Sequence, residues 1–136
     1  MLAADQASRG LGMQLKTIGA GSATLTMTVR ADMLNGFEIC HGGFITTLAD
    51  SAFAFACNSR NALTVAAGLT VDFLAPAHLG DVLTADAGEI TRAGRTGVYD
   101  VVVSNQLGKR VALVRGRSHG LAGRTVMPVA ADRDLP

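Results

Sequence analysis

The sequence predicts one α+β domain, spanning residues 1–136, in which a long apolar helix is buried against an antiparallel sheet of five to six strands. Two observations predict this fold class. Several stretches alternate between apolar and polar residues, as half-buried strands do. One central stretch instead repeats its apolar residues at every fourth position, which is the spacing of a helix face. A chain of 136 residues has room for one ordinary domain and no second.

The strands are expected on both sides of that helix. Residues 23–30 alternate Ala, Leu, Met and Val with Thr and Arg, and residues 13–18 before them are expected to complete a hairpin. The second half holds four further expected strands, at residues 64–73, 82–92, 96–105 and 110–119. Tight turns join the last three into an antiparallel meander, whereas residues 121–136 carry no pattern and are expected to form a loose tail.

The helix is expected over residues 43–58. Two rows of apolar side chains spaced by four cover most of its circumference; they are Phe44, Leu48 and Ala52, and Ile45, Ala49 and Phe53. A helix that is apolar on most sides is buried. Gly42-Gly43 provides the turn that feeds the helix, and Asn58-Ser59 offers its end.

Composition excludes several classes of protein. Hydrophobic residues make up 49% and charged residues 17% of the chain, so it is not a disordered polymer. A net charge of +1 gives no general attraction to nucleic acid or to an anionic membrane. No apolar run approaches the roughly 18 residues of a membrane span, and no secretory signal is visible. Cys40 and Cys57 are expected to be free thiols in a reducing cytoplasm, and their spacing with His41 predicts no metal site.

Asp50 is the only charged residue of the expected helix. A carboxylate among apolar residues is costly to bury, and its pKa is expected to rise. Such a group suits a general base or a nucleophile near neutral pH. A surface-facing aspartate or a packing hydrogen bond is the alternative interpretation.

His41, Gly42 and Gly43 lie where the helix begins. Backbone N–H groups are free at a helix N-terminus, and the helix dipole favours negative charge there. Glycines allow a carbonyl group to approach the backbone, so the pair is a candidate oxyanion hole. A flexible turn is the alternative.

Helix geometry separates these two candidates. Gly42 and Asp50 are eight residues apart, which is about 12 Å along a helix axis. If both act on one bond, the carboxylate must come from another subunit, and a two-fold dimer would hold two such sites.

A series of motifs runs along residues 10–120. It comprises Asn35-Gly36, His41-Gly42-Gly43, Leu48-Ala49-Asp50, Ala52 to Ser59, Val71 to Pro76, Gly80-Asp81, Gly94 to Asp100 and Arg115 to His119. This ordered series resembles the hotdog-fold acyl-CoA thioesterases, and in particular their phenylacetate-degradation branch. The resemblance implies the hotdog fold, in which a curved antiparallel sheet wraps around a long central helix.

The resemblance also implies roles for single residues. Asp50 would be the catalytic carboxylate, either activating water or attacking the thioester directly. The Gly42 amide would polarise the carbonyl, with Asn35 and His41 shaping that pocket. Neighbouring residues expected to contact the substrate are Gly43, Phe44 and Ser51. The family builds its site from two subunits, so a homodimer is the expected minimal active unit and a homotetramer the expected assembly.

The second half of the chain is locally basic. Seven basic residues and a single acid, Asp100, lie between Arg92 and Arg124. The resemblance points to the phosphates of coenzyme A, with Arg95, Thr96 and Arg117 as the expected contacts. Solvated strand faces and protection of sheet edges are the alternative roles.

These features together lead to the expectation of a cytoplasmic acyl-CoA thioesterase. Its substrate would be phenylacetyl-CoA or a hydroxylated analogue, cleaved to the free acid and coenzyme A, without a cofactor and without a nucleic-acid or membrane partner. The alternative is a hotdog module that binds acyl-CoA without turnover. Asp50 favours the enzyme.

Overall fold

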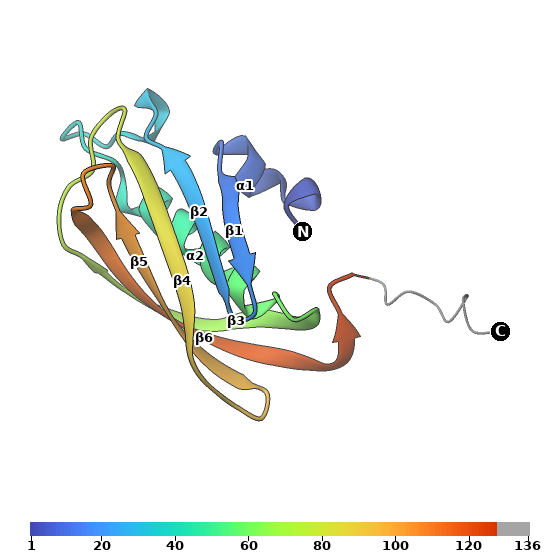
Figure 1. Ribbon diagram of the computed structural model, residues 1–136. Helices are drawn as coiled ribbons and strands as arrows, with labels where there is room; N and C mark the ends of the chain where they lie inside the picture. Colours follow the sequence, from blue (N-terminus) through green and yellow to red (C-terminus); the bar gives the residue numbers. More distant parts are fainter. Residues whose placement is uncertain (128–136) are drawn as a thin grey trace.

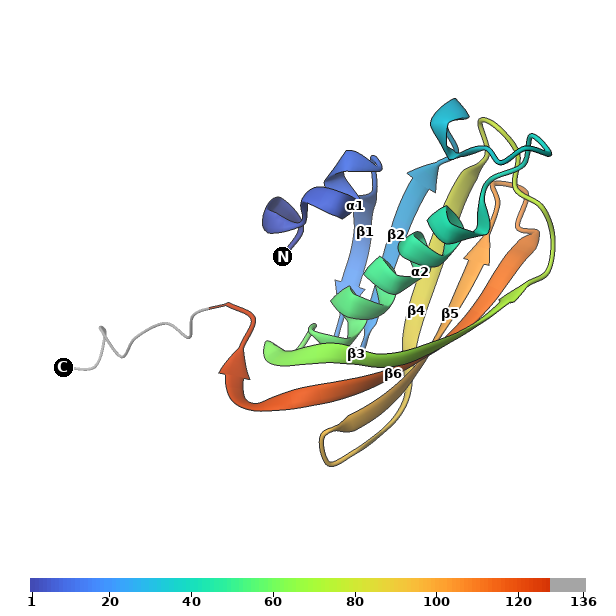
Figure 2. The same ribbon diagram turned by 180° about the vertical axis from the view of Figure 1, so that it is seen from behind.

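The computed structural model describes residues 1–127, which form a six-stranded antiparallel sheet curved around one long helix (Figure 1). The strands are β1 (Gln14–Gly19), β2 (Ser22–Thr28), β3 (Ala62–Phe73), β4 (Val82–Ala93), β5 (Thr96–Ser104) and β6 (Arg110–Thr125). Their order across the sheet is β1-β2-β4-β5-β6-β3, and every neighbouring pair is antiparallel. The helix α2 (Gly42–Cys57) lies along the inner face of the curve (Figure 2). The predicted α+β class, the hairpin and the meander are confirmed.

Small residues let α2 approach the sheet closely. Ala49, Ala52 and Ala56 of the helix have no exposed surface. On the sheet side, a Cβ built on Gly116 of β6 would lie 2.7 Å from the Phe53 ring, so the ring packs directly on the strand backbone. Helix and sheet therefore meet across alanines on one side and a glycine on the other, and this close packing fixes the position of α2.

Three short helical segments were not predicted. They are a turn at Leu2–Ala4, α1 (Gln6–Gly10) and a turn at Ala31–Met33. Each is too short to show a helical repeat in the sequence. Asp5 caps α1 by accepting a hydrogen bond from the backbone N–H of Ser8 at 3.0 Å. Among residues 1–127 no helix is long and apolar enough to cross a membrane.

The end of β6 differs from the expectation of a loose tail that begins at residue 121. The strand continues to Thr125, which pairs with Ala62 at the start of β3. Asn61 fastens this end, since its side chain accepts a hydrogen bond from the Met127 N–H at 2.7 Å and donates one to the Met127 carbonyl at 3.1 Å. Residues 121–125 form a strand because they pair with the start of β3, and their own sequence shows no strand pattern. The rest of the expected tail, residues 128–136, lies outside the described part of the chain.

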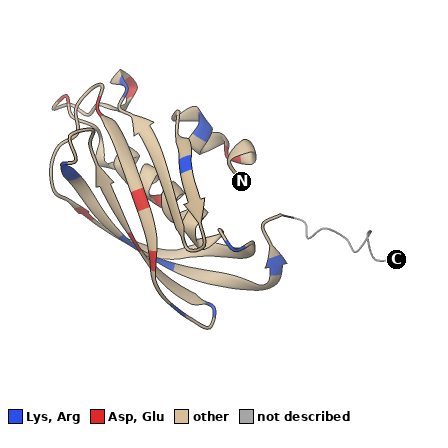
Figure 3. Ribbon diagram, viewed as in Figure 1, with Lys and Arg blue, Asp and Glu red and all other residues tan. Residues whose placement is uncertain are grey.

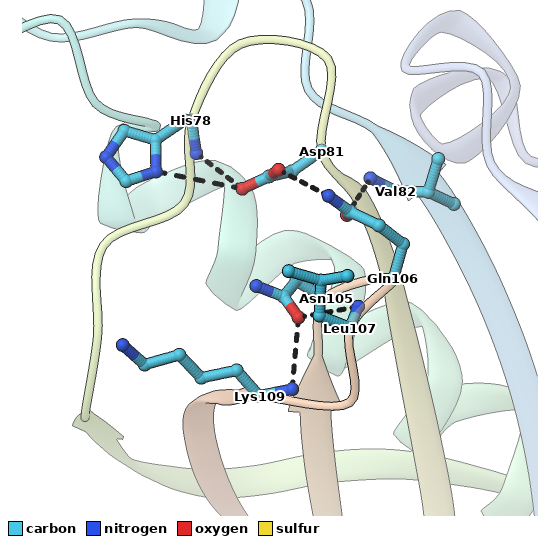
Figure 4. A network of polar contacts seen from close by, with 7 residues as sticks. All are labelled: His78, Asp81, Val82, Asn105, Gln106, Leu107 and Lys109. Carbon is cyan, nitrogen blue, oxygen red and sulfur yellow. Dashed lines mark hydrogen bonds and ion pairs between the residues drawn. The ribbon is translucent and has the colours of Figure 1, made fainter.

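A polar network fixes residues 74–81, the segment between β3 and β4 (Figure 4). Asp81 Oδ2 accepts from the His78 backbone N–H at 2.8 Å, and Gln106 Nε2 donates to Asp81 Oδ1 at 2.9 Å. Gln106 Oε1 accepts from the Val82 N–H at 3.0 Å. The hydrogen bond from Gln106 and then that from His78 hold the pKa of Asp81 below its usual value. The network ties this segment to the turn between β5 and β6.

The residues that end α2 connect it to the sheet. Asn58 Nδ2 donates to the carbonyl oxygens of Ala54, at 2.9 Å, and Thr64, at 3.0 Å, while its Oδ1 accepts from the Thr64 N–H at 2.9 Å. Ser59 Oγ accepts from the Gly21 N–H at 2.7 Å, which joins the helix end to the β1–β2 turn. Asn58 thus sets where β3 starts relative to the helix.

Replacing Asn58 by alanine is expected to lower the free energy of unfolding by about 1–3 kcal/mol, because the N–H and carbonyl groups of Thr64 lose their side-chain partner. The Ala54 carbonyl keeps its hydrogen bond from the backbone N–H of residue 58. Chemical denaturation measures the change. Gln6→Ala, at an exposed position of α1, is the control and is expected to change that free energy by less than about 0.5 kcal/mol. Equal stability of Asn58→Ala and the unmodified protein would contradict the role given to this side chain.

Candidate active site

The first turn of α2 carries a backbone donor without an acceptor. His41 is the N-cap residue, and its Nδ1 accepts from the Gly43 N–H at 3.0 Å. The next N–H, of Phe44, is bonded to the His41 carbonyl oxygen at 3.0 Å. Within residues 1–127 the N–H of Gly42 has no acceptor. A free N–H at a helix N-terminus is the kind of donor that stabilises a developing oxyanion.

The loop before α2 is organised by Asn35. Its Oδ1 accepts from the backbone N–H groups of Phe37, at 2.9 Å, and Ile39, at 3.4 Å. Glu38 at the tip of the loop has a φ of 61°, a left-handed conformation that these bonds help to hold. The Asn35 side-chain amide donor has no acceptor in the part of the chain that the structure describes. Asn35 therefore shapes the loop with its oxygen and leaves its nitrogen free to donate.

A groove of about 520 Å³ joins this loop to the start of the helix. Its lining includes Asn35, Gly42 and Phe73, which come from three different parts of the chain. A Cβ built on Gly42 would lie 2.7 Å from Cζ of Phe73, so the ring covers the backbone at the position where any larger residue would collide. Phe73 was not predicted. It is the last residue of an edge strand, and only the fold places its ring over Gly42.

Asp50 lies two turns further along α2 and is half-buried. Burial raises the pKa of its carboxyl group, and the charge of Asp5 adds to the increase. No hydrogen bond reaches the Asp50 carboxylate from any residue in 1–127. These surroundings agree with the expected environment of a general base. Asp50 is nevertheless about 12 Å from Gly42 along the helix axis, so one chain does not bring the two together.

Ser51 and Phe44 do not face the groove. Ser51 Oγ lies 2.8 Å from Ser8 Oγ, and Ser8 Oγ donates to Asp5 Oδ2 at 2.6 Å, so Ser51 is turned toward α1. The Phe44 ring packs edge-on against the imidazole of His41, with centroids 6.3 Å apart, and lies against the core. Both residues were expected to contact the substrate. In one chain Ser51 attaches α1 to α2, and Phe44 supports the helix cap.

A second cavity, of about 240 Å³, lies at the other end of α2. Arg95 and Thr96, two of the residues expected to contact coenzyme A, lie at the turn between β4 and β5 and line this cavity. Figure 3 shows basic positions at the tip of this hairpin and near the end of β6, and the further arginines that line the cavity are Arg60, Arg92 and Arg124. Glu89 pairs with Arg60 at 2.9 Å and with Arg92 at 2.6 Å. Arg95 and Arg124 have no carboxylate partner among the described residues.

Arg117 lies on the other face of the sheet. Side chains alternate along β6, so buried Ser118 points to the cavity while exposed Arg117 points outward. The guanidinium of Arg117 lies over Gly68 of β3. In one chain, therefore, Arg95 and Thr96 lie at the cavity while Arg117 lies on the outer face of the sheet. The alternation of side chains along β6 in the sequence indicates this separation.

The described chain thus has two sites of interest and an aspartate between them. Asn35, His41, Gly42 and Gly43 gather at one end of α2, and Arg95 and Thr96 lie at the other. The sheet and helix have the hotdog arrangement, and the helix carries both a free N–H at its start and a half-buried carboxylate. These are the features expected of a hotdog-fold thioesterase.

Comparison with known proteins gives the family. The model of the thioesterase superfamily matches residues 37–112. Acyl-coenzyme A thioesterase PaaI of Escherichia coli (strain K12) is 48% identical over 119 residues, which cover 88% of this chain and 85% of that protein. The solved structure of E. coli PaaI, from the phenylacetic acid degradation operon, matches with a TM-score of 0.91 at 46% identity and covers 93% of this chain and 91% of that one. A Streptococcus mutans protein, smu.793, solved with bound acetyl-CoA, matches with a TM-score of 0.79 at 27% identity, covering 83% and 91%.

The chain belongs to the thioesterase superfamily, and its fold is the hotdog fold. The predicted resemblance to the phenylacetate-degradation branch and the prediction of an enzyme of the thioester hydrolase class are confirmed by these matches. The roles of single residues stay predictions.

The raised pKa of Asp50 is expected to make the free energy of unfolding depend on pH. The folded protein binds the Asp50 proton more tightly than the unfolded chain, so the free energy of unfolding falls as pH rises from the unfolded pKa through the folded one. Asp50→Asn removes the charge and is expected to be more stable than the unmodified protein at pH 7, with the two converging near pH 3. Denaturation at several pH values measures this.

Asp86→Asn is the control, because Asp86 is exposed on the outer face of the sheet. Its curve should follow that of the unmodified protein within about 0.5 kcal/mol. A loss of stability in Asp50→Asn at pH 7 would contradict the description of Asp50 as a desolvated carboxylate.

Proposed function

We propose that the protein hydrolyses aryl-acetyl-CoA thioesters, phenylacetyl-CoA or a hydroxylated analogue, to the free acid and coenzyme A. The observation that carries the proposal is a free Gly42 N–H together with a desolvated Asp50 in a member of the thioesterase superfamily. The acyl group is inferred from E. coli PaaI, which comes from the phenylacetic acid degradation operon. The carrier is supported by the S. mutans relative that holds acetyl-CoA.

A second copy of the chain would complete this site. In one chain β3 is an edge strand beside β6, and its exposed side includes Val65, Phe73 and, just beyond the strand, Leu74. Two such edges related by a two-fold axis can pair antiparallel, which brings the Phe73 end of one strand against the Ala62 end of the other. Gly42, beneath Phe73, would then face the partner's Asp50. The site would then use Gly42 of one chain and the partner's Asp50, so the separation of about 12 Å between these two residues within one helix no longer matters.

The proposed reaction uses groups of the protein alone. The thioester carbonyl oxygen accepts a hydrogen bond from the Gly42 N–H, with the free amide of Asn35 nearby. The partner's Asp50 takes a proton from a water molecule as the water oxygen bonds to the carbonyl carbon. The carbon–sulfur bond then breaks, and the proton held by Asp50 passes to the departing thiolate, which leaves as coenzyme A. Direct attack by the carboxylate, followed by hydrolysis of the anhydride, is the second route. Neither route needs a cofactor.

The surroundings of the site complete the proposal. Arg95 and Thr96 at the hairpin tip, and Arg117 on the outer face, are proposed to bind phosphates of coenzyme A from one chain or its neighbour. The homodimer would be the active unit within a homotetramer. Cytoplasmic location is proposed because both cysteines are free thiols, as in a reducing compartment.

A panel of acyl-CoA thioesters, with a thiol reagent that reports released coenzyme A, tests the function. The unmodified protein is expected to hydrolyse phenylacetyl-CoA or its hydroxylated analogues fastest. Asp50→Asn is expected to lower kcat by about 10²–10⁴-fold, because general base catalysis contributes about that much, while the acyl-CoA still binds. Asp86→Asn, which is exposed on the sheet, should keep full activity.

Two results would contradict this proposal. Hydrolysis that survives in Asp50→Asn would exclude the mechanism. Tight binding of acyl-CoA without turnover of any thioester would identify the protein as a binding module.

A further inference from the structure

The short helix α1 begins at a carboxylate that is held in place and has no cationic partner. Asp5, the N-cap residue, accepts from the backbone N–H of Ser8 at 3.0 Å and from the Ser8 hydroxyl at 2.6 Å, one bond to each carboxylate oxygen. Asp5 is half-buried. Within residues 1–127 no basic side chain pairs with it, and Arg9 of the same helix donates instead to the Ala3 carbonyl oxygen at 3.0 Å. Asp5 therefore keeps its negative charge at a fixed position.

Two hydroxyls connect this carboxylate to the helix that carries Asp50. Ser8 is only 2% exposed, and its Oγ lies 2.8 Å from Ser51 Oγ. A hydroxyl has one proton to donate. Because Ser8 donates its proton to Asp5, Ser51 is the donor to Ser8. Both hydroxyls therefore donate toward Asp5, and this hydrogen-bonded chain ends at the residue that directly follows Asp50.

Helix capping alone does not account for a charged residue at position 5. Asn and Ser cap helices about as well as Asp does. Since α1 spans only Gln6–Gly10, its dipole is small and stabilises a charge little. A half-buried carboxylate without a cation costs free energy. The charge of Asp5 is thus kept at a cost, and it lies close enough to Asp50 to act on that second carboxylate.

The sheet presents no charged group to Asp50. Each strand packs apolar side chains behind α2, and these include, from β1 to β6 in turn, Leu15, Leu25, Leu69, Leu83, Val101 and Val114. Burial is the larger cause of the raised pKa of Asp50, and Asp5 is the second cause. Within residues 1–127 no other charged group contributes to that shift. Asp5 is therefore the charge that the fold places next to Asp50.

The other titratable groups around α2 are neutral near pH 7 or belong to the second chain. Cys57 lies on α2 itself, and burial is the first cause that raises the pKa of its thiol to about 11. Tyr99 of β5 packs its ring on Phe53 of α2, and burial raises the pKa of its hydroxyl as well. The proposed dimer would add the partner's His41. An effect of Asp5 on the reaction is thus separable from these groups by substitution.

We propose that Asp5 is a positioning residue of the active site, which through Ser8 and Ser51 holds the turn of α2 that carries Asp50 and places a second negative charge beside it. The inference rests on the proposed function. A neighbouring negative charge favours the protonated form of a carboxyl group, so Asp50 becomes a stronger base toward water. It also stays protonated up to a higher pH. The helix α1 would thus set the strength of the base without touching the substrate.

The pH profile of kcat/KM for phenylacetyl-CoA tests this role. Asp5→Asn keeps the cap and removes the charge, so the acid limb is expected to move to lower pH. One pH unit below the midpoint of the original limb, kcat/KM should rise about 2–3-fold, and on the plateau it should fall about 2–3-fold because the base is weaker. The two profiles therefore cross. A purely structural loss would lower activity at every pH and leave the limb in place.

Asp86→Asn is the matched control, because it removes an exposed carboxylate on the outer face of the sheet. Its acid limb is expected to coincide with that of the unmodified protein. Ser51→Ala is a second variant, which breaks the hydrogen-bonded chain and leaves the charge of Asp5 in the protein. Its limb is expected to move in the same direction as that of Asp5→Asn but by less, since Asp5 is no longer held against α2.

Denaturation at pH 7 measures the interaction without any turnover. The variants are Asp5→Asn, Asp50→Asn and the double variant. Either single substitution removes the repulsion between the two carboxylates, so the second substitution has no repulsion left to remove. The denaturation midpoint of the double variant is therefore expected to lie below the value obtained by adding the two single changes.

The outcomes separate this inference from the proposed function. In an active enzyme, an acid limb that stays in place in Asp5→Asn and Ser51→Ala overturns the inference alone. A limb that moves as far in Asp86→Asn would reflect net charge and would overturn it too. Absence of turnover by the unmodified protein overturns the proposed function, and additive midpoints in the denaturation cycle would then show independently that Asp5 does not act on Asp50.

Discussion

Eight residues of α-helix separate Gly42 from Asp50, and this length constrains everything proposed about the site. Each residue adds about 1.5 Å, so the free N–H at the helix start and the carboxylate two turns later cannot meet on one carbonyl group. Close packing of Ala49, Ala52 and Ala56 against the sheet holds the helix in place, which rules out a compensating shift. The separation must be bridged by a second copy or the two groups do not share a reaction.

The edge strand β3 connects this constraint to the rest of the molecule. At its Phe73 end lies the groove that contains Gly42, and near its Ala62 end lies the cavity that contains Tyr99 and Ser118. Antiparallel pairing of two β3 strands would place the groove of one chain beside the cavity of the other.

The sequence predicted the features that depend on local periodicity. Alternation located the strands, the spacing of four located α2, and the glycine pair marked its start. Local patterns did not predict Phe73 over Gly42 or the pairing that carries β6 to Thr125, because both depend on contacts between distant segments. Alternation along β6 predicts that Arg117 lies on the outer face of the sheet, away from Arg95, whereas the resemblance grouped the two residues.

Recovery of activity in mixed subunits tests the shared site most directly. Asn35→Asp keeps the oxygen that organises the loop and removes the free amide donor, while Asp50→Asn removes the base. If the site is shared, unfolding and refolding the two variants together gives mixed dimers with one intact site each, and activity should rise to about one quarter of that of the unmodified protein. Activity no greater than that of the separately refolded variants would show that one chain holds the whole site.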